Sequence, residues 1–276
     1  MNILITGANG QLGLALREEL KHHEIMGVDL PDHDIADKKI VDEIMIEAKP
    51  DVLLNCAAYT NVDGCAKDPE AAYRANALGP QNLALACLEH GTSMMQVSTN
   101  EVFDGSNPAG YEEWMAANPV NPYGSSKAAG EFNVRSILPQ HYIVRTAWLY
   151  ASTGRNFIHA ILNRAKETGK VSVVTDEIGN PTWAKDLAVA IGQLVETKRY
   201  GTYHFVNSGG CSRWEFANEI LKLAGVEAEN APILSSEFKR ASTPPPYGVL
   251  HNINGKQAGI YLRPWQDALA EFIRQM

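Results

Sequence analysis

Hydrophobic positions in the first half of the chain follow two different periods. Continuous apolar runs fill 2–6, 24–30, 51–56 and 94–98, whereas apolar residues recur at helical spacing in 11–22, 40–48 and 70–90. An apolar run between turn residues is typical of a strand covered on both faces, and a period near 3.6 is typical of an amphipathic helix. The pattern therefore predicts repeated strand-helix units, with the helix over 70–90 kinked or interrupted at Gly79-Pro80.

The second half of the chain continues this alternation less regularly. The pattern predicts a helix over 123–137, a strand over 142–146, helices over 184–196, 214–223 and 265–276, and short strands such as 203–206. The polar stretch 100–121 contains several Gly and Pro residues and predicts a long, mobile surface loop over the carboxyl ends of the strands. Together these elements predict an α/β fold with a doubly wound parallel (Rossmann) sheet and a smaller lobe built from C-terminal segments.

Composition and charge exclude several classes of function. The 276 residues are 45% apolar and carry a formal net charge of -8, so no global basic field attracts a nucleic acid. We expect no membrane partner, since no run of about 18 apolar residues and no signal-peptide pattern occurs. The four cysteines form no CxxC pair, so we expect buried thiols in a reducing, cytoplasmic compartment and no metal site.

Three glycines mark the end of the first predicted strand. Gly7, Gly10 and Gly13 form a GxxGxxG pattern where the first helix begins, and such a turn brings main-chain N–H groups close to a pyrophosphate. Asp29 ends the second strand, where a carboxylate accepts hydrogen bonds from an adenosine ribose and disfavours a 2′-phosphate. The alternatives are a tight strand-helix turn and an ordinary turn aspartate.

Polar groups near the fourth predicted strand suggest acid-base chemistry. Tyr123 and Lys127 are four residues apart in a predicted helix, so they share one face, and the ammonium group should lower the pKa of the phenol. Ser98 and Thr99 end the strand, where a hydroxyl can donate a hydrogen bond to a substrate carbonyl. A pair on the helix surface and a strand-capping hydroxyl are the alternatives.

The sequence resembles the extended short-chain dehydrogenase/reductases and, within them, the dTDP-4-dehydrorhamnose reductases. The resemblance covers nearly the whole chain. The motifs that carry it are at 7–13, 55–63, 98–99 with 102–105, 123–127, 145–150, and 179–182 with 186–188.

The resemblance implies reduction of the C4 keto group of a 4-keto-6-deoxy sugar nucleotide by NADPH or NADH, with dTDP-4-dehydro-L-rhamnose as substrate and dTDP-L-rhamnose as product. It implies that Thr99, Tyr123 and Lys127 are catalytic and that Thr99, Trp148, Asn156 and Thr182 bind the sugar nucleotide. The implied cofactor-binding residues are Gly7, Gly10, Gln11, Leu12, Gly13, Asp29, Asp34, Ile35, Ala57, Ala58, Tyr59, Ser98, Tyr123 and Lys127.

The same resemblance implies a division of the chain. We expect 1–149 to form the dinucleotide-binding domain, with returning segments near 171–206, and 150–170 and 207–276 to form mainly the substrate-binding lobe. The sugar nucleotide is expected between them, with Trp148 packed against the hexose.

The chain departs from the family pattern at three places. Asn100-Glu101 replaces a usual Asp-Tyr, and 244–248 reads Pro-Pro-Pro-Tyr-Gly where Arg-Pro-x-x-Ser is usual. Ala15 stands where some relatives have a glutamate that bridges two subunits through a metal, so we expect a monomer or a homodimer formed in another way.

Two other functions remain open at this stage. One is a non-catalytic, nucleotide-binding regulatory subunit like the beta subunit of methionine adenosyltransferase, which resembles the same family. The other is a different sugar-nucleotide reductase or epimerase of the extended family. The presence of Thr99, Tyr123 and Lys127 together favours an enzyme.

Overall fold

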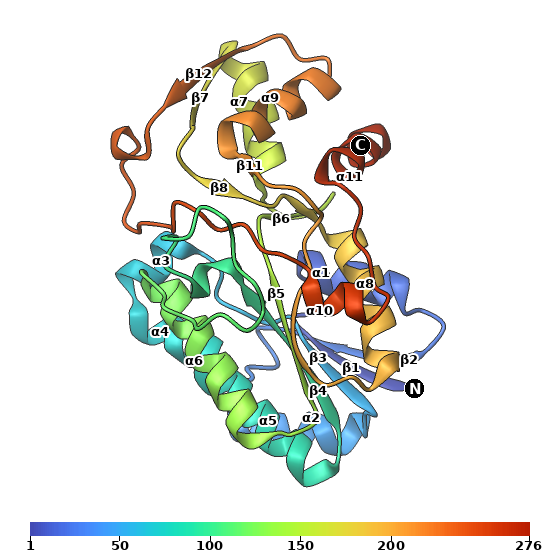
Figure 1. Cartoon of the computed structure of the whole chain (residues 1–276). Coiled ribbons are helices and arrows are strands. Elements are labelled where there is room, and N and C mark those ends of the chain that lie inside the picture. Colours follow the sequence, from blue (N-terminus) through green and yellow to red (C-terminus); the bar gives the residue numbers. More distant parts are fainter.

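The computed structural model describes all 276 residues and is built around a six-stranded parallel sheet (Figure 1). Its strands are β1 (Asn2–Thr6), β2 (Glu24–Val28), β3 (Val52–Asn55), β4 (Ser93–Thr99), β5 (His141–Thr146) and β10 (Gly201–His204). They lie in the order β10-β5-β4-β3-β1-β2. The strand order reverses between β1 and β3, and ligands of such sheets bind beyond the carboxyl ends at that point.

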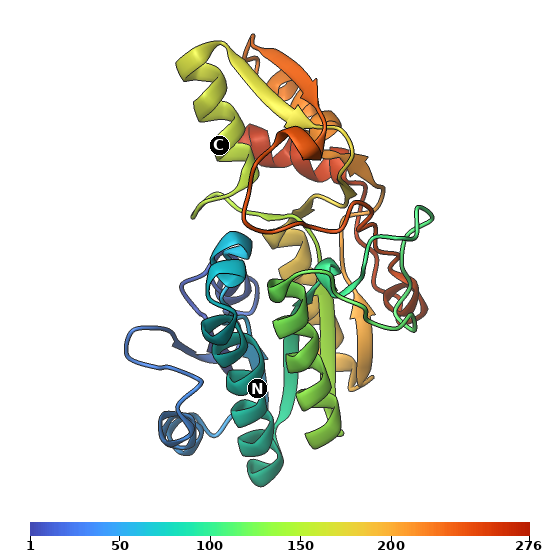
Figure 2. The same cartoon turned by 90° about the vertical axis from the view of Figure 1, so that its left-hand side faces the viewer.

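Helices cover both faces of the sheet, as its apolar strands require. One face packs against α1 (Gln11–Glu19) and α8 (Ala184–Thr197), whose leucines join a core with β1, β3 and β5. The other packs against α2 (Lys38–Ala48), α5 (Gly79–His90) and α6 (Pro122–Ile137). Figures 1 and 2 show the resulting three layers, which confirm the predicted doubly wound α/β fold.

The expected interruption near Gly79-Pro80 takes the form of a π-helical segment. After α3 (Val62–Lys67) and α4 (Pro69–Tyr73), residues Arg74–Leu78 form a π-helix that leads directly into α5. Pro80 has no N–H, so the Asn76 carbonyl lacks the donor that an α-helix would provide. The Gly79 N–H donates to Arg74 O, five residues earlier, and not to the residue four positions earlier as in an α-helix. A short proline-driven change of helix type therefore separates α4 from α5.

A second group of elements lies above the sheet in Figure 1 and has its own core. It contains α7 (Phe157–Thr168), α9 (Arg213–Leu223) and α11 (Trp265–Gln275), with β7 (Lys170–Val174) paired to β12 (Glu229–Ile233). Two-residue pairs join it to the sheet, β6 (Leu149–Tyr150) with β9 (Thr182–Trp183), and β8 (Ile178–Gly179) with β11 (Cys211–Ser212). We call this group the cap and the six-stranded sheet with its helices the sheet body.

Two segments lie elsewhere than expected. The stretch near 171–206 was expected to return to the sheet, but β7 pairs with β12 in the cap, and the return begins only at α8. Conversely, α10 (Ile253–Gln257) and the following Ile260 and Leu262 lie against the sheet body, although 207–276 was expected to lie mainly in the other lobe. Both differences arise because strand partners and packing partners are distant in the sequence.

The loop expected to be mobile is anchored by buried side chains. A 3-10 helix spans Asn100–Val102, and Phe103 and Tyr111 stack in a small core with ring centroids 4.2 Å apart. The Glu113 carboxylate accepts hydrogen bonds from the main-chain N–H of His204 (3.2 Å) and of Asn254 (3.0 Å). The loop is therefore fixed to β10 and α10.

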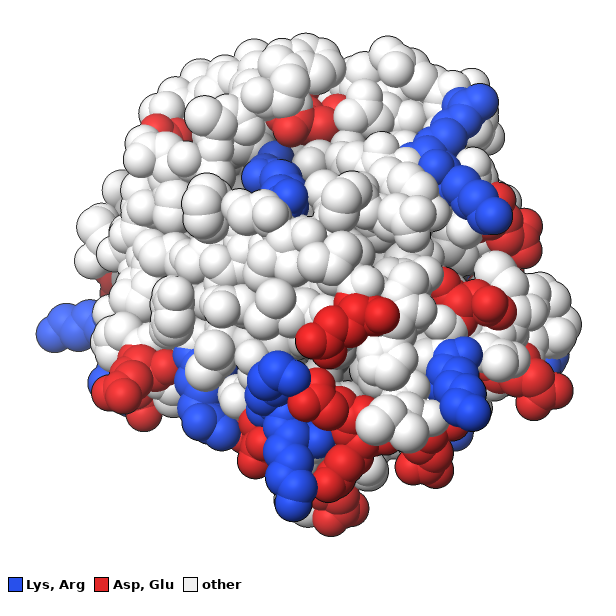
Figure 3. Space-filling view, turned by 90° about the horizontal axis from the view of Figure 1, so that it is seen from below, with Lys and Arg blue, Asp and Glu red and all other residues white.

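Three further features are the distribution of surface charge, the state of the cysteines and the character of the helices. Seen from below, Lys and Arg side chains are interspersed with Asp and Glu, without a large area of one sign (Figure 3). Cys65, Cys87 and Cys211 are buried, Cys56 is partly buried, and all four are free thiols. No helix in the structure has the length and apolar character that crossing a membrane requires.

Candidate active site

The turn between β1 and α1 presents a bare helix N-terminus. Gly10 is the N-cap residue of α1 and supplies no side chain to bond the first N–H groups of the helix. The Leu12 side chain is buried in the core, so only its main chain can face a ligand. Gln11 Oε1 is buried and has no hydrogen-bond partner, whereas Nε2 donates to Arg155 O at 3.2 Å. The free main-chain N–H groups at the start of α1 and the open space beside Gly10 suit an anionic group.

The three glycines of the turn are required for different reasons. Gly7 has φ +68°, and a Cβ there would lie 2.6 Å from Ala57 N, so β1 and the segment after β3 approach closely. A Cβ on Gly13 would lie 2.3 Å from Gly7 O. On Gly10 it would meet a single protein atom within 4 Å, Gly7 O at 3.2 Å. Gly7 and Gly13 thus maintain the turn, and Gly10 leaves room above it.

Acidic residues after β2 border the same turn. Asp29 Oδ2 accepts a hydrogen bond from Asn9 N at 2.9 Å, so the carboxylate lies against the glycine turn as expected for a ribose acceptor. Asp34 pairs with Arg74 at 2.7 Å; burial alone would raise the pKa of Asp34, but the Arg74 hydrogen bond and others lower it overall. Ile35 is buried, and its side chain fills the space in front of Gly79.

The segment after β3 is fixed by Asn76 of the π-helix. Asn76 Oδ1 accepts from Tyr59 N (2.8 Å), and Nδ2 donates to Tyr59 O (3.0 Å) and to Ser126 Oγ on α6 (3.0 Å). Ala57 N donates to Asn55 Oδ1 at 3.1 Å, which holds the first residue of the segment. The expected cofactor-lining residues 57–59 are therefore tied to the helix that carries Tyr123 and Lys127.

Thr99, Tyr123 and Lys127 come together at the carboxyl end of β4. Asn121 caps α6, its Oδ1 accepting from Gly124 N at 2.8 Å, so Tyr123 lies in the first helical turn. Lys127 follows one turn later, buried, and Nζ donates to Val97 O at 2.7 Å. Thr99 is at the end of β4, where its hydroxyl accepts from Glu101 N at 3.2 Å.

The pKa values of the pair differ from the expectation. Burial, and then the nearby Glu101 carboxylate, raise the pKa of the Tyr123 phenol, and a hydrogen bond with Thr99 lowers it only in part. Burial lowers the pKa of Lys127 to about 8. The pKa of the phenol is therefore raised overall, and not lowered as expected, while the Lys127 ammonium group donates to the main chain of β4.

A buried ion pair lies one turn beyond Lys127. Glu131 receives two hydrogen bonds from Arg145 on β5, from Nε at 2.8 Å and from Nη2 at 2.7 Å, and both side chains are at most 2% exposed. Burial would raise the pKa of Glu131, but the hydrogen bonds and charge of Arg145 lower it overall. The pair fixes the catalytic face of α6 to the sheet.

A cavity of about 1180 Å³ lies between the sheet body and the cap. Trp148 and Asn156 line it, as expected for residues near a sugar nucleotide, and so do Asn100 and Glu101 beside Thr99. Five cationic side chains and three acidic ones line it, namely Arg155, Arg164, Lys170, Arg213 and Arg240 with Asp63, Glu101 and Glu177. A hollow of this size and net positive charge suits a bulky, anionic ligand.

Trp148 is held in an uncommon conformation at the cavity wall. Its φ is +45°, which a bulky residue adopts only when its surroundings enforce it. The Arg213 guanidinium lies 3.6 Å from the ring centroid, and Gly179 packs so closely that a Cβ there would be 2.6 Å from Trp148 Cε2. The indole is thereby fixed between the two bodies of the molecule.

Thr182 does not reach the cavity. Its side chain is fully buried, and its hydroxyl donates to Asn180 O at 3.2 Å. Thr182 instead belongs to the β6–β9 pair that connects the sheet body to the cap, so its expected contact with the sugar nucleotide stays a prediction that the cavity lining does not support.

Three residues escaped the sequence analysis. Asn76 and Arg213 are single polar residues within helices, and nothing in their neighbourhood along the chain marks them as site residues. Asn121 could have been recognised as an N-cap by its place before Pro122 and Gly124. Their roles depend on contacts with distant segments.

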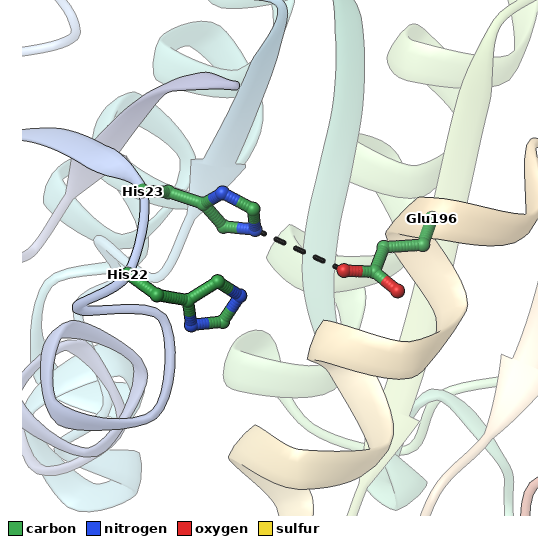
Figure 4. A group of neighbouring side chains, drawn as sticks. All are labelled: His22, His23 and Glu196. Carbon is green, nitrogen blue, oxygen red and sulfur yellow. Dashed lines mark ion pairs between the residues drawn. The ribbon is translucent and has the colours of Figure 1, made fainter.

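A separate histidine group lies away from the cavity. His22 and His23 precede β2 and face Glu196 near the end of α8 (Figure 4). Their ligand atoms lie within 4.8 Å of one another, and His23 Nε2 is 3.8 Å from Glu196 Oε1. Ligands of a tetrahedral zinc ion are about 3.3 Å apart, given bonds of about 2.0 Å, so His23 and Glu196 are farther apart than two ligands of one zinc ion.

Comparison with known proteins matches this arrangement to one family. The family model described as "RmlD substrate binding domain" matches residues 1–276. The solved dTDP-4-dehydrorhamnose reductase of Clostridium acetobutylicum is 40% identical, with a TM-score of 0.97 and complete coverage of both chains. The chain belongs to the dTDP-4-dehydrorhamnose reductase family.

Other known proteins are similarly close. The Bacillus anthracis reductase, solved in complex with NADP, is 38% identical with a TM-score of 0.96, and 99% of each chain is covered. The spore coat polysaccharide biosynthesis protein SpsK of Bacillus subtilis is 36% identical over 99% of this chain and 97% of its own length. Membership identifies the chain as an oxidoreductase of the NADP-binding, Rossmann type.

Proposed function

We propose that this protein uses NADPH or NADH to reduce the C4 keto group of a 4-keto-6-deoxy sugar nucleotide, converting dTDP-4-dehydro-L-rhamnose to dTDP-L-rhamnose. The observation that carries the proposal is the convergence of Thr99, Tyr123 and Lys127 at the carboxyl end of β4, next to Asn100 and Glu101 of the cationic cavity. The family's named activity, and the NADP bound by a relative, support it.

The residues around the β1–α1 turn fit a dinucleotide. The bare N-terminus of α1 and the space beside Gly10 would hold the pyrophosphate, the unpartnered Gln11 Oε1 would accept from a hydroxyl or N–H of the cofactor, and Asp29 would accept from the adenosine ribose. The remaining contacts would come from the expected cofactor-binding residues beyond the turn, which are Asp34, Ile35, Ala57, Ala58, Tyr59, Ser98, Tyr123 and Lys127.

Proton transfer to the substrate is assigned to Tyr123. When bound, the reduced nicotinamide supplies a hydride to the sugar carbonyl, and the carbonyl oxygen then needs a proton. Burial and Glu101 raise the pKa of Tyr123, so the phenol is protonated at neutral pH and can act as the acid. The Thr99 hydroxyl, at the end of β4, would donate a hydrogen bond to the same oxygen.

Lys127 supports the phenolate that remains after this transfer. Its pKa of about 8 leaves it mostly charged at pH 7, so the ammonium group opposes the negative charge that forms on Tyr123. We assign Lys127 a second role, the binding of the nicotinamide ribose.

The sugar nucleotide is assigned to the cavity between the sheet body and the cap. The excess of cations there compensates the charge of a diphosphate, and the Trp148 indole, held by Arg213, offers a flat apolar surface to the hexose. Asn156 is the N-cap of α7, and its Nδ2 donates to Ala151 O at 2.7 Å, so it shapes the cavity rim.

The direct test is the absorbance of reduced nicotinamide during incubation with a panel of 4-keto-6-deoxy sugar nucleotides. We expect stoichiometric oxidation of NADPH or NADH with the dTDP-linked substrate. An epimerase would change the sugar without net oxidation, and a regulatory subunit would bind nucleotide without turnover. Either result would overturn the proposal.

We also assign the chain to the cytoplasm, as a monomer or homodimer, with a dinucleotide-binding domain over 1–149 and a substrate lobe centred on the cap. Four free thiols support a reducing compartment, and Ala15 provides no carboxylate for a metal bridge between subunits. Light scattering with and without Mg²⁺ tests the assembly, and a Mg²⁺-dependent dimer would contradict it.

A further inference from the structure

Glu101 brings a carboxylate to the cavity wall next to the catalytic threonine. It lies in the 3-10 helix two residues after Thr99 and lines the cavity with Trp148 and Arg213. Its Oε2 accepts a hydrogen bond from Asn121 Nδ2 at 2.7 Å, whereas Oε1 makes no hydrogen bond within the chain. One oxygen of this side chain is therefore free to accept from a ligand.

The main chain around Glu101 is fixed tightly. Glu101 N donates to Thr99 Oγ1 at 3.2 Å, and a Cβ on Gly124 would lie 2.0 Å from Glu101 O. The residue is thus pressed against the first turn of α6, beside Tyr123, where no larger residue than glycine fits. Its main chain is therefore held beside both catalytic residues, and the Asn121 hydrogen bond holds Oε2 of its carboxylate.

The two departures from the family pattern on this side contact each other. Asn121 Nδ2 donates to Thr243 O at 3.2 Å as well as to Glu101. A Cβ on Gly248 would lie only 2.2 Å from Asn100 Nδ2, so a serine there would collide with Asn100 as placed. Asn100-Glu101 and the segment 243–248 therefore form one wall, in which a serine at 248 would require the Asn100 side chain to move.

The chemistry of this wall calls for a hydrogen-bond donor. Burial raises the pKa of Glu101, Asn121 lowers it in part, and the charges of Arg213 and Arg240 lower it further. Glu101 is partly buried and borders the cavity, so a substrate that displaces solvent from Oε1 has to supply a donor or leave this oxygen unsatisfied, at a cost of about 1–3 kcal/mol. A 4-keto-6-deoxy sugar offers one hydroxyl next to the carbonyl that Thr99 and Tyr123 are assigned to contact, the hydroxyl on C3, because C5 carries the ring oxygen and the methyl group.

We propose that Glu101 is a specificity-determining residue that accepts a hydrogen bond from the sugar hydroxyl next to the reacting carbonyl. This proposal rests on the proposed function. The protein then selects sugar nucleotides that carry a hydroxyl at C3 and discriminates against 3-deoxy sugars. A site built to hydrogen-bond a hydroxyl rejects the analogue that lacks it more strongly than an apolar site can.

The test compares kcat/KM for a 4-keto-6-deoxy sugar nucleotide and for its 3-deoxy analogue in the wild type, E101Q and E101M. We expect the wild type to prefer the hydroxylated substrate by about 10- to 100-fold, from one charge-assisted hydrogen bond. E101M should lose most of this preference, through slower reaction of the hydroxylated substrate, and E101Q should retain part of it because its amide oxygen still accepts. Glu70→Gln, an exposed charge change on α4, is the matched control and should leave the ratio unchanged.

An unchanged ratio in E101M would overturn the role of Glu101. A second measurement does not need turnover. Calorimetry in a Tyr123→Phe background gives the dissociation constants of the two sugar nucleotides, and their ratio is compared with and without the change at Glu101. Absence of turnover in every variant would contradict the reduction, while the binding ratio would still decide whether Glu101 reads the hydroxyl.

Discussion

Glycines that are equivalent in the sequence pattern differ in what surrounds them. Gly10 faces open space and has φ -73°, so a side chain there strains no backbone, whereas a Cβ on Gly13 meets Gly7 O at 2.3 Å. We expect Gly10→Leu to fold normally and to lose cofactor affinity, and Gly13→Ala to be destabilised by about 1–3 kcal/mol from overpacking. Denaturation curves and NADPH titrations of both variants check this. Undiminished affinity in Gly10→Leu would contradict the assignment of the turn.

Tyr123→Phe removes the proton donor and keeps the ring. We expect kcat to fall by about 10²- to 10⁴-fold, the usual contribution of general acid-base catalysis, with cofactor affinity nearly intact. Steady-state kinetics and cofactor titration of the purified variant provide the measurement. Full activity would leave the proton donor unidentified.

Lys127 combines a role in catalysis with a cost in stability. The pKa of Lys127 in the folded protein, about 8, lies below the ordinary 10.5. Between these pH values the unfolded chain binds more protons than the folded one, so the free energy of unfolding increases as the pH rises from 8 to 10.5. Lys127→Met should therefore raise the free energy of unfolding at pH 7 by roughly 2 kcal/mol, after about 1 kcal/mol for the lost hydrogen bond to Val97, and should lower kcat. Wild-type kcat should decline above pH 8, as the ammonium group loses its proton. Urea denaturation and a pH profile test both parts.

Local sequence was sufficient for some site residues and not for others. Tyr123, Lys127 and the glycines lie within short motifs at the boundary of an element, so their chain neighbours reveal them. Arg213 and Asn76 act on residues far away along the chain, and the burial of Thr182 depends on strand pairing that its motif does not reveal. The sequence analysis considered only Lys127 as a neighbour of Tyr123. Burial and Glu101 raise the pKa of the phenol, so the expected decrease was wrong.

At the scale of the element, α6 depends on its attachment to β5. Glu131 and Arg145 are both buried, so Glu131→Gln leaves the guanidinium without its counter-charge. Breaking a buried pair from one side costs about 3–5 kcal/mol. We expect urea denaturation to show a decrease of that size in the free energy of unfolding. We also expect a lower kcat, because the pair fixes the face of α6 that carries Lys127 to the sheet. Glu18→Gln, which breaks the exposed pair with Lys21, should change stability by less than about 1 kcal/mol.

Most elements could be predicted because each has a clear period, and the elements that differ show why others could not. The apolar run of β7 identifies a strand but not its partner, and β12, which it pairs with, begins 55 residues after β7 ends. The π-helix depends on one missing N–H at Pro80, which marks an interruption without fixing its geometry.

For the whole molecule, charge is distributed unevenly. The chain carries a net charge of -8, yet the cavity is lined by five cations and three acids, a local excess of two positive charges. We therefore expect KM for the sugar nucleotide to rise several-fold between low and high ionic strength, since salt screens this attraction. Arg164→Gln should weaken the salt dependence, and Arg274→Gln on α11, outside the cavity, should not. A KM independent of salt would contradict an electrostatic role of the cavity.

The course of the backbone between the sheet body and the cap limits how these enzymes can be re-engineered. The chain leaves the sheet after β5, returns with α8 and β10, leaves with β11, returns with α10 and ends in the cap with α11. Neither body is a contiguous cassette, so exchanging one stretch of sequence with a relative would sever strands and helices of both. New substrate preferences are better introduced by grafting individual side chains, with positions in contact, such as Asn100 and Gly248, transplanted as a set.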